Sequence, residues 1–221
     1  MIAAHGGAGA TTVALAISDA LASTGRPVHL IDTAAPGRSG LISAASAELG
    51  LDEAGEWRRG TRNGVTLDRR STDAPPRSWP SPPPGPPGVT VLDLGLGQAA
   101  EAPSGEPVVV VCRPTVPAGR LLERQLRELG ERSVVVAAIG RGRWPGEVVA
   151  SLGPMTAALR STGRIVQVPL NDRLMVTGLD DRPLPKAVCD AGLALFELLA
   201  YETRVAAPAR HRAPTSGRSA R

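Results

Sequence analysis

Short runs of β-branched apolar residues alternate with helical patterns along most of this chain. The runs that we interpret as buried strands are 28–32, 89–93, 108–112, 134–139 and 165–168. Apolar residues at helical spacing predict helices over 11–23, 119–129, 145–159 and 185–199. Continuous apolar strands separated by helices are typical of a parallel sheet that is covered on both faces. We therefore predict an α/β fold with a doubly wound, mostly parallel sheet and helices on both faces.

The predicted domain spans residues 1–201, and two segments differ from it in composition. Proline is abundant in 74–88, which excludes helix and sheet ladder there because proline lacks the N–H donor. We interpret this segment as an extended surface insertion that acts as a stiff spacer or, alternatively, as a docking ligand for an aromatic-lined groove. Residues 202–221 are rich in Arg, Pro, Ser and Ala, so we expect a disordered basic tail.

The positive charge of the chain is concentrated in this tail. The formal net charge is +4, and residues 203–221 contain five arginines and no acids, so the remainder is nearly neutral. We expect weak, salt-dependent contact with nucleic acid through the tail at most. Five arginines lie among acidic residues at 56–70, and we interpret them as a solvated face: Arg58, Arg59, Arg62, Arg69 and Arg70.

Cysteine content and hydropathy indicate a reducing, cytoplasmic setting. Cys112 and Cys189 are too few for a disulfide framework and lack metal-ligand spacing, so both are predicted to be buried thiols. No apolar stretch is long enough for a membrane span, and no signal peptide is evident at the start of the sequence.

A glycine-rich segment, His5-Gly-Gly-Ala-Gly-Ala-Thr-Thr12, comes immediately before the first predicted helix. Small residues let successive backbone N–H groups point inward, and a helix N-terminus attracts anions. The predicted nucleotide-binding residues are Gly6, Gly7, Ala8, Gly9, Ala10, Thr11 and Thr12. A phosphate loop of this shape normally carries a lysine where Ala10 stands. The chain contains a single lysine, Lys186, so no nearby lysine can replace it.

Further positions are predicted to bind metal, and each has a simpler alternative. Thr11, Asp32 and Asp93 are the predicted Mg²⁺ residues, because both aspartates end predicted strands where doubly wound sheets bind ligands. The aspartates could instead cap loops, and Thr11 and Thr12 could cap the helix. His5 is interpreted as an ordinary loop residue. Only 1–4 precede the loop, which is short for a central strand, and we expect missing residues upstream.

From the loop to about Leu199 the sequence resembles the ParA/MinD family of deviant P-loop ATPases, and within it the TadZ/CpaE-like members. The family's first motif has lysines at the positions of His5 and Ala10, and its Asp-x-Asp turn corresponds to Asp32-Thr33-Ala34, which keeps the first acid only. The 91–97 segment resembles the Walker B strand, with Asp93 holding Mg²⁺ through water. The 108–117 and 168–172 segments resemble later family motifs.

The resemblance implies ATP and Mg²⁺ as ligands and a homodimer formed across the nucleotide face. Because two lysines and one acid are replaced, we expect a catalytically degenerate member that scaffolds a pilus, secretion or conjugation assembly together with a protein partner. It would bind ATP weakly, without turnover.

Two other functions remain as alternatives. One is a slow ATPase in which an arginine such as Arg38 replaces the missing lysines, and the other is a nonspecific DNA-binding partition-type protein. Some family members attach to membrane through a terminal amphipathic helix. The sequence after Tyr201 shows no such helix, so we predict no direct membrane anchor.

Overall fold

The computed structural model describes residues 1–73, 81–97 and 101–206, and side chains up to residue 200. Two hydrogen-bonded ladders have the strand orders β1-β7-β8-β9 and β3-β4-β5-β2-β6. The strands are β1 (Ile2–Ala3), β2 (Val28–Asp32), β3 (Ala47–Leu51), β4 (Trp57–Arg62), β5 (Val65–Arg70), β6 (Val89–Asp93), β7 (Val108–Cys112), β8 (Val134–Gly140) and β9 (Ile165–Pro169). The five predicted strands correspond to β2, β6, β7, β8 and β9.

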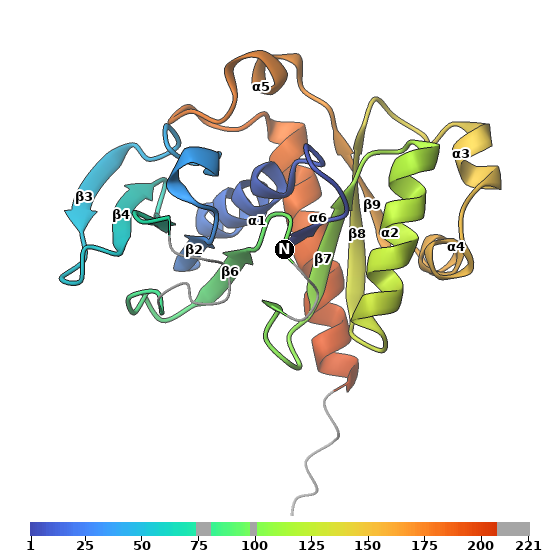
Figure 1. Cartoon of the computed structure of the whole chain (residues 1–221), viewed down its shortest axis with the longest axis horizontal. Helices are drawn as coiled ribbons and strands as arrows, with labels where there is room; N and C mark the ends of the chain where they lie inside the picture. The colour runs from blue at the N-terminus through green and yellow to red at the C-terminus, as the bar shows by residue number, and fades with distance from the viewer. Residues whose placement is uncertain (74–80, 98–100, 207–221) are drawn as a thin grey trace, which may run out of the picture.

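Backbone hydrogen bonds connect the two ladders at β1 and β6. Leu94 N–H donates to the Met1 carbonyl at 3.0 Å, and Ala3 N–H donates to the Gly95 carbonyl at 2.6 Å. The neighbours from β5 through β2 and β6, and from β1 through β7 and β8 to β9, are parallel pairs. The two ladders therefore continue into each other through β6 and β1, as Figure 1 shows.

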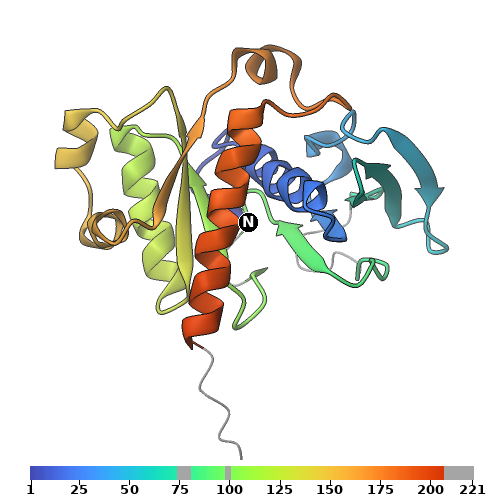
Figure 2. The same ribbon diagram turned by 180° about the vertical axis from the view of Figure 1, so that it is seen from behind.

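Helices cover both faces of the sheet. Helix α1 (Ala10–Ser23) packs against α6 (Lys186–Ala206) on one face, and α2 (Val116–Leu129) covers the other face beside α3 (Gly146–Ala150) and α4 (Pro154–Ser161). The α6 face is turned toward the reader in Figure 2. Two apolar clusters follow this division, since alternate residues of β7 and β8 belong to opposite clusters. This confirms the predicted fold class.

Two predicted helix boundaries were wrong. The expected helix over 145–159 is divided into α3 and α4, because Pro154 lacks the N–H that would continue a helix and instead begins α4. Glu123 of α2 stabilises the new helix end by accepting hydrogen bonds from the Met155 and Thr156 N–H groups, each at 3.0 Å. Helix α6 continues to Ala206, beyond the expected domain boundary at Tyr201, and residues 207–221 lie outside the described residues.

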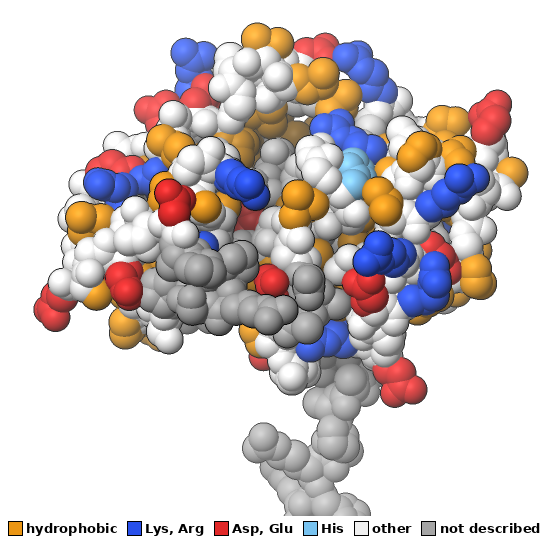
Figure 3. All heavy atoms as spheres, in the orientation of Figure 1, with side chains coloured by type: hydrophobic (Ala, Val, Ile, Leu, Met, Phe, Trp, Pro, Cys, Tyr) orange, Lys and Arg blue, Asp and Glu red, His pale blue; other side chains and the backbone are white. Residues whose placement is uncertain are grey.

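The prediction of a solvated arginine face at 58–70 was also wrong for three of its five residues. The antiparallel strands β4 and β5 turn Arg62, Arg69 and Arg70 inward, and their side chains are buried. The Arg62 guanidinium contacts the Asp19 carboxylate and the carbonyls of residues 44, 180 and 182. Figure 3 shows basic and acidic side chains interspersed over one face of the molecule, not gathered into one patch.

The end of the proline-rich insertion packs against the sheet. The Arg59 guanidinium donates to the carbonyls of Pro83 and Pro84, the latter at 3.0 Å. Gly85 lies so close to the His29 ring that a Cβ atom would not fit. The described residues 81–88 thus lie over β2 on the face opposite α1. Residues 74–80 lie outside the described part, so the spacer and docking interpretations remain predictions.

Candidate functional site

The glycine loop wraps the start of α1 in a conformation that its small residues allow. Gly7 and Gly9 have positive φ angles of 70° and 97°. A Cβ atom on Gly9 would lie 2.5 Å from Ile139 Cδ1, so both backbone conformation and space require glycine there. Ala8 and Ala10 are buried, which anchors the loop to the core under α1.

The N-terminus of α1 has no side-chain cap. Its N-cap residue is Gly9, and neither Thr11 nor Thr12 caps the helix, so the simple structural interpretation of these threonines was wrong. The N–H groups of the first helical turn have no acceptor inside a helix. Together with the helix dipole these N–H groups attract negative charge to this end of α1.

Two predicted metal residues meet at the carboxyl edge of the sheet beside this loop. Asp32 ends β2 and Asp93 ends β6, and the two are paired in the parallel register. Asp32 Oδ1 accepts a hydrogen bond from Ala34 N–H at 2.9 Å, and Oδ2 accepts one from the Ser39 hydroxyl at 2.6 Å. Both side chains are 1% exposed.

Both carboxylates are costly to ionise. Burial raises the pKa of Asp32 to about 6, and the charge of Asp93 adds to the rise, while the hydrogen bonds from Ser39 and Ala34 oppose it. Burial also raises the pKa of Asp93, although the Thr11 hydroxyl and the Gly95 N–H lower it in part. A cation near these two groups would relieve their mutual repulsion.

The residues present fit a magnesium ion that is held mainly by water and phosphate. Asp93 Oδ2 is buried and has no hydrogen-bond partner among the described residues, and Thr11 lies beside it. Mg²⁺ characteristically takes one or two carboxylates and keeps water and phosphate ligands. The described residues contain no cluster of three or more His, Cys, Asp or Glu side chains, so the protein offers this ion a partial coordination shell only.

An arginine that we did not predict reaches the glycine loop. Arg113 follows β7, and its Nε and Nη2 atoms lie 3.4 Å from the Gly7 carbonyl oxygen. Arg38, the predicted substitute for the lysines, lies in the 3-10 turn Pro36–Arg38. It is exposed, and its guanidinium group bonds to none of the described residues. The signal for Arg113 was its place just after a strand, at the carboxyl edge where doubly wound sheets bind ligands.

His5 holds Arg113 near the loop. The Arg113 backbone N–H donates to His5 Nε2 at 3.2 Å, and His5 Nδ1 lies 2.8 Å from the Gly6 carbonyl. This arrangement corresponds to a neutral imidazole with its proton on Nδ1. His5 therefore links the loop to the end of β7, which is a more specific role than the ordinary loop residue that we predicted.

Two other predicted features lie apart from the loop. Asn171 caps α5 (Asp172–Thr177) by accepting from Leu174 N–H, and Asp172 forms an exposed ion pair with Arg141. Cys112 is buried, as predicted, which raises its pKa to about 12, whereas Cys189 is only partly buried. None of the helices within the described ranges is long and apolar enough to cross a membrane.

The fold is that of the MinD and ParA ATPases, doubly wound α/β proteins with a phosphate-binding loop. A MinD cell division protein of Aquifex aeolicus, solved as a MinC:MinD complex, is 17% identical with a TM-score of 0.55, covering 89% of this chain and 93% of that one. A ParA family ATPase from Chlorobium tepidum is 13% identical with a TM-score of 0.54, covering 87% and 95%.

A third similar structure contains a nucleotide analogue. The plasmid partition protein of Borrelia burgdorferi, bound to AMPPNP, is 12% identical with a TM-score of 0.53, covering 91% of this chain and 96% of that one. No protein-family model and no curated protein matches the sequence. At these identities the likeness establishes the fold and leaves function to the site.

Proposed function

We propose that this protein binds a nucleoside triphosphate with Mg²⁺ at the glycine loop and uses the bound state to position a partner protein, with little or no turnover. The observation that carries the proposal is the combination of an uncapped helix N-terminus with the buried, unpartnered Oδ2 of Asp93. Backbone N–H groups would hold the phosphates, and Thr11 and Asp93 would hold the ion. Bound Mg²⁺ would neutralise phosphate charge.

The missing cation is the reason for expecting little turnover. Phosphoryl transfer depends on charge stabilisation, and a single arginine contributes about 10³–10⁵ in rate in related systems. Position 10 carries a buried alanine in place of a lysine. We infer a degenerate relative of the TadZ/CpaE type, a cytoplasmic homodimer that scaffolds a pilus, secretion or conjugation assembly.

A fluorescent ATP analogue, titrated with and without Mg²⁺, tests the proposal. We expect saturable binding that Mg²⁺ strengthens, and Asp93→Asn should abolish the Mg²⁺ effect. Ala10→Lys should tighten binding by roughly 10- to 100-fold, because a charged hydrogen bond to phosphate contributes about 1.5–3 kcal/mol. If the Ala10→Lys variant binds the analogue and the wild type does not, nucleotide sensing is contradicted and the protein has a protein-interaction role only.

A slow ATPase is the second candidate, and Arg113 is the observation that favours it. A guanidinium next to the loop could contact phosphate in two places at once. Phosphate release that persists in Arg38→Ala and is lost in Arg113→Ala would establish this activity and place its charge on Arg113. If phosphate release by the wild type stays below detection, with or without a partner protein, the result supports the scaffold function.

A further inference from the structure

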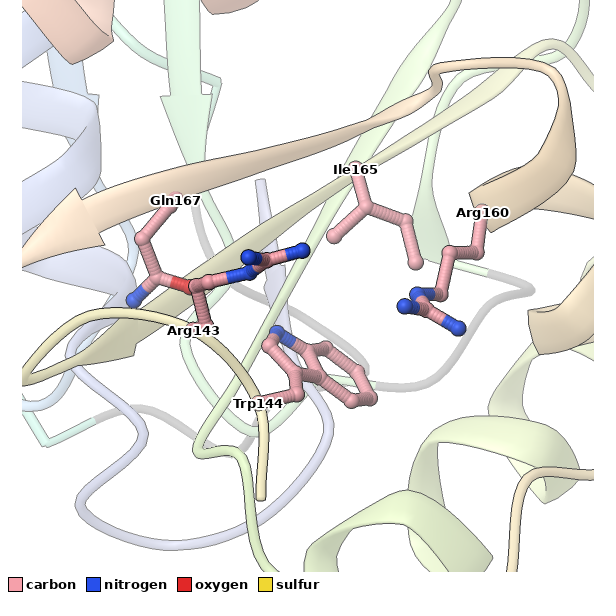
Figure 4. A pocket seen from close by; sticks show the side chains of 5 residues that line it. All are labelled: Arg143, Trp144, Arg160, Ile165 and Gln167. Atoms are coloured by element: carbon pink, nitrogen blue, oxygen red, sulfur yellow. The ribbon is translucent and has the colours of Figure 1, made fainter. Parts of the chain in front are cut away.

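One cavity lies away from the glycine loop, along the edge strand β9. It has a volume of about 460 Å³ and is lined by Arg143, Trp144, Arg160, Ile165 and Gln167. Figure 4 shows the guanidinium groups of Arg143 and Arg160 approaching the Trp144 ring from different sides. The volume is within the range of small-molecule sites. No residue of the glycine loop lines it.

The charged groups in this cavity are uncompensated. Arg143 and Arg160 are exposed, and neither guanidinium group forms an ion pair or hydrogen bond with another described residue. The lining contains no carboxylate. Two free guanidinium groups that face one space favour an anion with several oxygens, because each can donate two parallel hydrogen bonds to a phosphate.

The other lining groups are suited to a planar ring. Trp144 is partly buried and packs against the apolar cluster beneath α2, so its position is fixed by the core. Gln167 lies in the middle of β9, opposite Ala138, and its Nε2 is buried without a hydrogen-bond partner among the described residues. Indole rings stack on nucleobases, and an amide can pair with the donor and acceptor edge of a base.

We propose that this cavity is a second ligand site, which binds a mononucleotide with its phosphate between Arg143 and Arg160 and its base on Trp144. The proposal is independent of nucleotide binding at the glycine loop, because the two sites share no residue. A mononucleotide has a partner for each of the four polar or aromatic lining side chains. Its phosphate suits the two arginines, and its base suits Trp144 and Gln167. Ile165 provides the apolar wall.

Calorimetric titration with adenosine monophosphate tests the site. We expect Arg143→Ala, Arg160→Ala and Trp144→Leu each to weaken binding by roughly 10-fold or more. Arg120→Ala is the matched control, because Arg120 is an exposed arginine on α2 outside the cavity, and it should bind as the wild type does. Circular dichroism would verify that every variant is folded.

Variants of the glycine loop separate this site from the first one. Asp93→Asn and Arg113→Ala should leave adenosine monophosphate binding unchanged. The proposal is overturned if these variants lose binding while the cavity variants keep it, or if the cavity variants bind like Arg120→Ala. Inorganic phosphate and adenosine alone should each bind more weakly than the monophosphate, and a single-stranded oligonucleotide that binds far more tightly would replace the mononucleotide as the ligand.

Discussion

One buried aspartate, Asp68, and a pair of buried aspartates, Asp32 and Asp93, lie in the same sheet and differ in how their negative charge is balanced. Asp68, on β5, accepts two hydrogen bonds from Arg59, at 2.8 and 2.6 Å, and lies 2.6 Å from His29 Nε2. Burial alone would raise the pKa of Asp68, but these partners more than offset it and the pKa is lowered. Asp32 and Asp93 lie beside each other, and their pKa values are raised.

The difference separates an acid that stabilises the fold from two acids for which we propose a ligand. A buried carboxylate with a complete set of donors contributes to structure, whereas removing one partner leaves a costly charge. A buried carboxylate whose neighbours do not offset the cost of burial raises the free energy of the folded state and gains from any cation that binds. Strongly perturbed acids of this kind gather at functional sites.

Removal of the Asp68 charge should produce the largest effect. Asp68→Asn leaves the Arg59 and His29 side chains without their carboxylate, and we expect a loss of about 3–5 kcal/mol in the free energy of unfolding. Urea denaturation at pH 7 measures it. Arg58→Ala, at an exposed position of β4, is the control, with an expected change within about 0.5 kcal/mol. Equal effects of the two variants would contradict the assignment of Asp68 as a structural acid.

Removal of the Asp32 charge should have the opposite sign. The folded protein holds the Asp32 proton up to a pH of about 6, whereas the ordinary pKa of an aspartate is 3.8. This group therefore lowers stability progressively as pH rises from 3.8 to about 6. Asp32→Asn should remove that slope and stabilise the protein by about 1–3 kcal/mol above pH 7. Thermal melts over pH 4 to about 8 measure it, and an unchanged slope would place the carboxylate in a relaxed, hydrated environment.

Magnesium should give an effect no larger than that of Asp32→Asn. Together with ATP, Mg²⁺ binds the folded state only and should raise the unfolding free energy by about 1–3 kcal/mol at saturating concentrations. Asp93→Asn should lose the Mg²⁺-dependent part of this gain, and Asp68→Asn should retain it. A thermal shift measured with and without Mg²⁺ makes the comparison. If both variants lose the Mg²⁺-dependent stabilisation, the loss reflects a destabilised protein and not a damaged ion site.

The parallel part of the fold was predictable because its strands carry uninterrupted β-branched runs. The strands β3, β4 and β5 were missed because arginines and acids interrupt their apolar pattern. The Asn63-Gly64 pair, with φ angles of 46° and 81°, forms the turn between β4 and β5 and is the local signal that could have indicated a hairpin. Burial of the arginines depends on partners distant in sequence, which periodicity does not reveal.

The site was predictable in its loop and less so in its partners. Spacing of the glycines and threonines predicted a tight turn before α1, and the ends of two strands predicted that Asp32 and Asp93 lie at one sheet edge; ligand binding there stays a prediction. Arg113 is about a hundred residues from the loop in sequence and meets it only because β1 and β7 are neighbours. The cavity beside β9 combines an edge strand with the end of α4, so no local motif identifies it.

The contacts of Arg62 also constrain how the protein is made. Its guanidinium bonds to carbonyls at residues 180 and 182, and Gly192 of α6 lies against the α1 backbone at Ala16. During synthesis the first half of the chain leaves the ribosome with this cation paired to Asp19 but lacking its two later carbonyl partners, and with α1 uncovered. We therefore expect the nascent chain to stay protease-sensitive and open to chaperones until residues beyond 190 have emerged, and then to close in one late step.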